Sequence, residues 1–181
     1  MATFCTANES IRNRLEGEPG SKWGFVIFRC TYKSDDKWRL FMEYFKTMVQ
    51  AKLAREELSD CFSHLDWSVQ EDPGYEGMQI DEIRTKFQQW IASGAERDDG
   101  SARFMACLRV DEIDVDSVVQ IDQPPETGDP RGWMSLDLVS IHEEEDFVSV
   151  GIGYLLPRAY LLIEDPGWWV VYREDGDVSL P

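Results

Sequence analysis

The segment KWGFVIFRCTY, residues 22–32, restricts most strongly what this chain can fold into. It is rich in β-branched and aromatic residues, which favour extended structure on a pleated, partly buried surface. Apolar residues stand at consecutive positions, so both faces of the predicted strand carry apolar side chains. Such a strand is typical of the interior of a sheet. The sequence therefore predicts a sheet in which residues 22–32 form a central strand.

The rest of the chain alternates between helix and strand patterns. Residues 34–58 predict a long amphipathic helix with Ser34 as its N-cap, and residues 79–93 predict a second helix. Residues 111–119 fit either a strand continuation or a short helix capped by Asp111, and we favour the helix. The remaining segments predict strands at 65–70, 102–110, 133–141 and 167–174, a short strand after 146 and helical turns near 154–162.

This alternation predicts an α+β fold with the helices on one face of the sheet. We expect a ferredoxin-like sandwich, elaborated or internally doubled. A doubly wound α/β fold is the alternative, but no glycine-rich turn follows the first predicted strand. Residues 22–181 are expected to form a single globular domain, and residues 1–21 a polar, frayed N-terminal arm.

Composition excludes several classes of partner. The net charge is −17, and residues 111–146 hold 12 acidic and one basic side chain, so binding to nucleic acid is not expected. No apolar run is long enough to span a membrane, and the N-terminus has no signal-peptide pattern. We therefore expect a cytoplasmic protein without a membrane partner.

No motif predicts a cofactor or a metal site. The four cysteines form no C-x-x-C pair and no cluster with zinc spacing, so free thiols are expected. No P-loop, dinucleotide fingerprint or G-x-S-x-G motif is present. His142 stands beside the acidic run 143–146, which predicts a solvated turn, with loose binding of a divalent cation as the alternative.

His64 and Asp66 are the candidate catalytic residues. A histidine beside a carboxylate is the minimal general acid–base pair. In a strand, positions 64 and 66 share a face, with Cβ atoms roughly 7 Å apart. The alternative is an exposed histidine at the start of a strand whose Trp67 is buried in the core.

Alternation along the predicted strands indicates a ligand-binding face. One face of each strand is uniformly apolar, and the other mixes polar and apolar groups, as a ligand pocket or a subunit interface does. Cross-strand ion pairs on a wet sheet face would give the same pattern. If the mixed face exists, the guanidinium groups of Arg29 and Arg109 should lie within about 10 Å of each other. The candidate binding residues on this face are Phe25, Arg29, Gln70, Met105, Cys107 and Arg109.

Two functions fit this pattern. The first is a non-enzymatic module that binds a small organic ligand, with an anion favoured by the arginines, or a protein partner such as a second subunit, over the open face of the sheet. The second is a cofactor-free isomerase, cyclase or hydrolase, with His64 or Asp66 as base and Arg29 or Arg109 holding an anion. The absence of a catalytic motif favours the first.

Five segments carry a resemblance to a known family. They are GFVIFRCTY at 24–32, an acid and tryptophan at 36–38, WSVQED at 67–72, RTKFQQW at 84–90 and CLRVD at 107–111. In these segments, and over roughly residues 22–120, the chain resembles intracellular proteins of filamentous fungi for which no activity is established. The resemblance implies an origin and a cytoplasmic location, not a mechanism.

Overall fold

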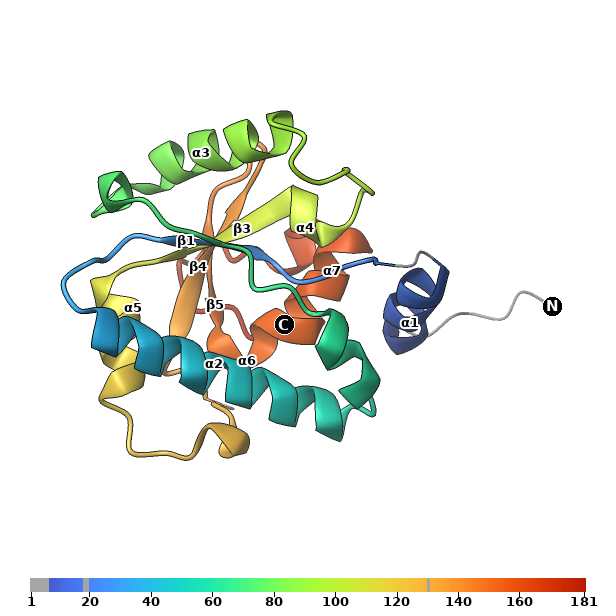
Figure 1. The fold of residues 1–181 in the computed structure, drawn as a ribbon, viewed down its shortest axis with the longest axis horizontal. Helices are drawn as coiled ribbons and strands as arrows, with labels where there is room; N and C mark the ends of the chain where they lie inside the picture. Colours follow the sequence, from blue (N-terminus) through green and yellow to red (C-terminus); the bar gives the residue numbers. More distant parts are fainter. Residues whose placement is uncertain (1–6, 18–19, 130) are drawn as a thin grey trace.

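The computed structural model describes residues 7–17, 20–129 and 131–181, and it confirms the α+β class (Figure 1). A five-stranded mixed sheet has the order β2-β1-β3-β4-β5. Strand β1 pairs in parallel with β2 and β3, whereas β3 and β4, and β4 and β5, pair antiparallel. The strands are β1 Val26–Arg29, β2 Val69–Gln70, β3 Ala106–Val110, β4 Ser135–Ser140 and β5 Val148–Gly151.

Helices cover both faces of the sheet, not one face as the ferredoxin-like expectation required. Helix α2 (Asp35–Arg55) packs on one face and α3 (Ile80–Ala92) on the other, as Figure 1 shows. The cause lies in β1, where Ile27 belongs to the core under α2 and Phe28 to the core under α3. The part β2-β1-β3, with its two connecting helices on opposite faces, is arranged as in doubly wound sheets.

The predicted caps of two helices are confirmed. The Ser34 hydroxyl accepts a hydrogen bond from the Lys37 N–H at 3.2 Å. The Asp111 carboxylate accepts from the N–H groups of Ile113 and Asp114, which start α5 (Glu112–Val119). The other helical segments are α1 Ala7–Gly17, η1 Ser59–His64, η2 Pro73–Tyr75, α4 Ala102–Met105, η3 Pro125–Thr127, α6 Ile152–Tyr154, η4 Leu155–Ala159, α7 Tyr160–Glu164 and η5 Trp168–Val170.

The expected polar arm is partly helix. In α1, Ile11 and Leu15 lie four residues apart on one helical face, and both are buried in the core. The Arg14 guanidinium also pairs with the Glu164 carboxylate at 2.7 Å. The expectation of a frayed arm is therefore wrong for residues 7–17, while residues 1–6 and 18–19 lie outside the described residues.

Two predicted strands contain helical turns instead. Residues 102–105 form α4, so the chain becomes extended only at Ala106, which starts β3. In the segment 167–174, Gly167 has φ +127° and leads into η5. Alternation alone does not separate such turns from a short strand.

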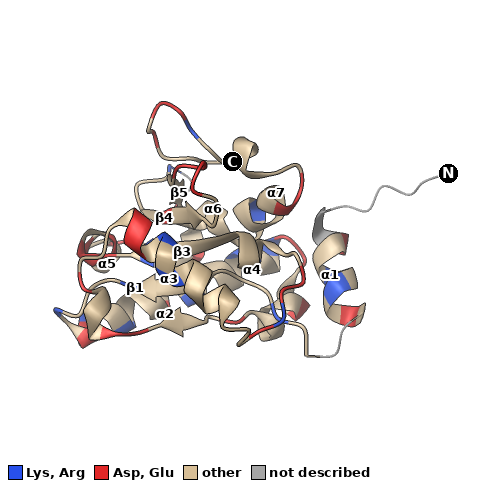
Figure 2. Cartoon of the chain, turned by 90° about the horizontal axis from the view of Figure 1, so that it is seen from above, with Lys and Arg blue, Asp and Glu red and all other residues tan. Residues whose placement is uncertain are grey.

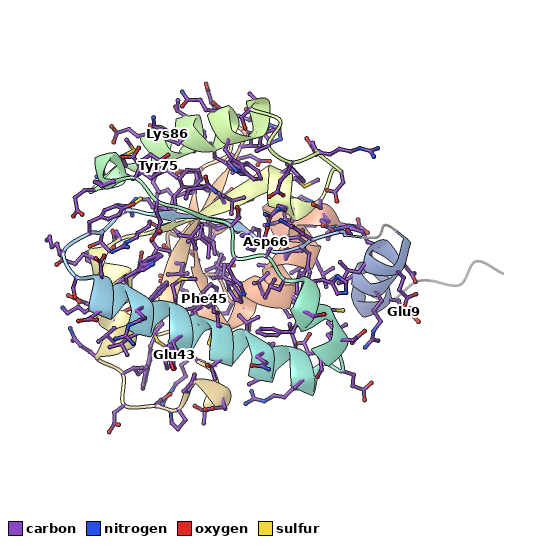
Figure 3. All side chains as sticks on the ribbon, viewed as in Figure 1. Glu9, Glu43, Phe45, Asp66, Tyr75 and Lys86 are labelled. Atoms are coloured by element: carbon purple, nitrogen blue, oxygen red, sulfur yellow. The ribbon has the colours of Figure 1, made fainter. Side chains whose placement is uncertain are left out.

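The predicted strand at 65–70 is shorter than expected. Leu65 forms an isolated bridge with Trp23, and only residues 69–70 pair as β2. Trp67 packs edge-on against Phe45 of α2, with ring centroids 5.2 Å apart, and Figure 3 shows Phe45 between that helix and the sheet. Trp67 precedes the edge strand β2 and is half-buried, so the prediction of a buried Trp67 is wrong, although the ring does pack against the core.

Candidate functional site

Arg29 and Arg109 lie on opposite faces of the sheet. In the register of β1 and β3, Arg109 stands beside Phe28, and therefore on the α3 face. Arg29, the next residue in β1, faces α2, where its guanidinium lies 5.0 Å from the centroid of the Trp38 ring. The prediction that the two guanidinium groups converge is wrong, because the open mixed face that it assumed does not exist.

Local partners satisfy both arginines. The Arg29 guanidinium donates to the carbonyl of Thr31 and to the carboxylates of Asp35 and Glu71. The Arg109 guanidinium donates to the Met78 carbonyl at 2.8 Å and to two carboxylates on its own face, those of Asp111 at 3.1 Å and Asp137 at 3.0 Å. Neither group is left to hold an external anion.

The other predicted binding residues are divided between the two layers. Phe25 is buried against Tyr160, and Met105 packs at the margin of the same core under α2. On the α3 side, Cys107 is fully buried, which raises the pKa of its thiol well above the ordinary value. Gln70 stands beside Phe28 in the register of β1 and β2 and donates to the Ser68 hydroxyl. These residues do not form one pocket.

The predicted catalytic pair has structural partners. His64 ends η1 with an exposed side chain, and its carbonyl accepts from the Trp23 N–H at 3.3 Å. Asp66, labelled in Figure 3, pairs with Arg103 at 2.8 Å and with Lys22 at 3.0 Å. This carboxylate therefore belongs to an ion-pair network beside the start of β1.

Sequence reasoning missed a pocket near the opposite edge of the sheet, where β4 leads into β5. It has a volume of about 510 Å³ and lies between the acidic segment after β4 and the turn η5. We call it the aromatic pocket. It is lined by Glu144, Glu145, Asp146, Gly167, Trp168, Trp169 and Tyr172.

Its aromatic wall comes from a single short segment. Trp169 is 73% exposed, which is unusual because tryptophan side chains are highly buried on average. The indole N–H of Trp168 is buried and has no hydrogen-bond partner in the described chain. The pocket wall therefore has an exposed ring, that of Trp169.

Arg84 of α3 holds the acidic wall in place. Its side chain is buried, and its guanidinium donates to the backbone carbonyls of His142 and of Glu145, the latter at 2.8 Å. The Glu145 carboxylate accepts from the Ser140 hydroxyl. The backbone of the acidic segment is thus tied both to α3 and to the end of β4.

The carboxylates of this wall have no cation beside them among the described residues. Neither Glu144 nor Asp146 takes part in an ion pair within the described residues, and no basic side chain is among those that line the pocket. Figure 2 shows acidic residues in the loops beside β5 and the C-terminus. Ring faces and carboxylates both attract cations, so the pocket suits an organic cation. Its volume lies in the range usual for small-molecule sites.

Searches for wider similarity add nothing to this geometry. Comparison of the chain with protein-family models, with curated protein sequences and with solved structures gives no match. No described helix has the length and apolar character needed to cross a bilayer. Among the described residues, His, Cys, Asp and Glu side chains do not gather in any group of three suited to a metal ion.

Proposed function

We propose that this protein is a non-enzymatic module that binds a small organic cation, such as an alkylammonium group, in the aromatic pocket. The observation that carries the proposal is the combination of three aromatic side chains with the unpaired carboxylates of Glu144 and Asp146. A cation over an aromatic face gains about 0.5–2 kcal/mol, and more when it is desolvated.

A cation fits better than the anion expected from the arginines. The predicted anion depended on Arg29 and Arg109, and both are neutralised by carboxylates that contact them directly. The enzymatic alternative has less support, since no histidine is among the residues that line the pocket, and Asp66 is held by Arg103 and Lys22.

Calorimetric titration with choline tests the proposal. The control ligand is 3,3-dimethylbutanol, which has the same shape without the charge. We expect saturable binding of choline and no measurable binding of the alcohol. Replacing Trp169 by Ala should weaken choline binding about fivefold, the effect of losing about 1 kcal/mol of cation–π attraction. Equal binding of the two ligands, or no saturable binding of either, would contradict the proposal.

The acidic segment itself offers a matched control. Glu143 and Glu144 are adjacent and both exposed, but only Glu144 lines the pocket. Glu144→Gln should therefore lower the affinity for choline, while Glu143→Gln, with the same change in net charge, should leave it unchanged. An equal loss in the two variants would show a diffuse effect of charge instead of a site.

A further inference from the structure

A second, smaller pocket continues the aromatic pocket. It has a volume of about 170 Å³, and it shares Asp146 and Tyr172 with the first. The two pockets therefore adjoin each other, and together we call them the groove. The second is lined by Asp146, Phe147, Val148, Ser149, Tyr172, Arg173, Glu174, Gly176 and Asp177.

The C-terminal segment builds the far side of this groove. Strand β5 is an edge strand, and Ser179 pairs with its outer side. The Ser179 N–H donates to the Ser149 carbonyl at 2.8 Å, and the Gly151 N–H donates to the Ser179 carbonyl at 2.9 Å. These bonds anchor the turn at 173–177 beside the start of β5, so the second pocket is built into the fold.

The second pocket also has carboxylates without an ion-pair partner among the described residues. Its one basic side chain, Arg173, pairs with Asp175 at 2.7 Å. Within the described residues, Glu174 and Asp177 then have no ion-pair partner. The second pocket is also lined by Phe147, by Val148 and by Tyr172, which it shares with the first pocket. The groove therefore offers carboxylates in both pockets, with apolar surface beside them.

We infer that the ligand is an aliphatic diamine or polyamine. One ammonium group occupies the aromatic pocket, and a second lies by Glu174 and Asp177, with the methylene chain over Tyr172 and Phe147. This inference rests on the proposed function, and it adds a second charge and an apolar linker. A single quaternary ammonium group would use only the first pocket.

Titration with butylamine, butane-1,4-diamine and spermidine tests the inference. After correction for the two equivalent ends of the diamine, we expect it to bind about threefold to tenfold more tightly than butylamine at low ionic strength. Spermidine should bind at least as tightly as the diamine. High salt should remove most of the difference, because the second charge lies in a groove open to solvent.

Variants separate the inference from the proposed function. Glu174→Gln should reduce the advantage of the diamine and leave butylamine binding unchanged. Trp169→Ala should weaken all three amines. Glu126→Gln is the matched control, because Glu126 is exposed and lines neither pocket. If butylamine and the diamine bind equally, the inference is wrong while the proposed function stands. If no amine binds, the proposed function itself fails.

Discussion

Asp111 and Asp114 cap each other at the start of α5. The Asp111 N–H donates to the Asp114 carboxylate at 2.9 Å, and the Asp114 N–H donates to the Asp111 carboxylate at 3.2 Å. Burial raises the pKa of Asp114 to about 8, and the nearby carboxylates of Asp111 and Asp137 act in the same direction. Asp114 therefore keeps its proton in the folded chain at pH values where an unfolded aspartate is ionised.

The first prediction is that Asp114 weakens the fold as the pH rises. The folded chain binds a proton that the unfolded chain releases above about pH 4, so the contribution of Asp114 to stability is complete below that pH. It is lost as the pH rises towards about 8, by roughly 1 kcal/mol per pH unit. Asp114→Asn should remove this loss.

Urea unfolding of the wild type and of Asp114→Asn, between pH 5 and 8.5, measures the effect. The variant should gain stability relative to the wild type as the pH rises. Asp122→Asn, the same change at an exposed position, should follow the wild type throughout. A difference between Asp114→Asn and the wild type that stays constant with pH would contradict the assignment.

The second prediction concerns Arg84. Its guanidinium joins α3 to the acidic wall of the aromatic pocket through two backbone carbonyls. Arg84→Gln should speed amide hydrogen exchange at 141–147 and weaken choline binding, because the carboxylates of Glu144 and Asp146 lose their fixed position. Arg84→Lys can keep one of the two hydrogen bonds. Its exchange rate and its affinity for choline should therefore lie between those of the wild type and of Arg84→Gln. Unchanged exchange in Arg84→Gln would exclude this role.

The third prediction compares two tryptophans. Trp23 is 1% exposed, and its indole N–H donates to the Cys61 carbonyl at 2.9 Å. Trp67 is half-buried and packs against Phe45. Trp23→Ala should cost about 3–5 kcal/mol of unfolding free energy, and Trp67→Ala clearly less, about 1–3 kcal/mol. Equal losses in denaturant unfolding would show that Trp67 is as much a core residue as Trp23.

The fold could be predicted from the sequence as far as its periodicity is unambiguous. Apolar residues on both faces of β1 predicted a central strand, and Ser34 and Asp111 predicted two helix starts. Two apolar faces indicate that helices cover both sides of the sheet, but Arg29 and Arg109 were interpreted as marking an open face. Arginine can face a covered side of the sheet when carboxylates lie nearby, as Asp35 and Glu71 do for Arg29.

The candidate site could not be predicted in the same way. The site has two walls, formed by residues 144–146 and 167–172. Strand β5 and the helical segments α6, η4 and α7 separate them in the sequence. Strand alternation describes single segments and carries no information about which segments meet. Two signals were present in the sequence: acids at 143–146 without a neighbouring basic residue, and adjacent tryptophans at 168–169. Neither shows by itself that the two lie together.

The last prediction separates binding from stability in the acidic segment. Glu143 and Glu144 are exposed, and within the described part of the chain the Glu145 carboxylate accepts a hydrogen bond from the Ser140 hydroxyl, which glutamine can also contact. Changing all three to Gln should alter the unfolding free energy by less than about 1 kcal/mol, as for most surface charges. It should nevertheless weaken choline binding, since two of the three carboxylates that line the aromatic pocket are lost. Thermal unfolding and calorimetry on the same samples measure both quantities. A large loss of stability would show that the segment holds the fold together, and unchanged affinity would show that its charge does not serve the pocket.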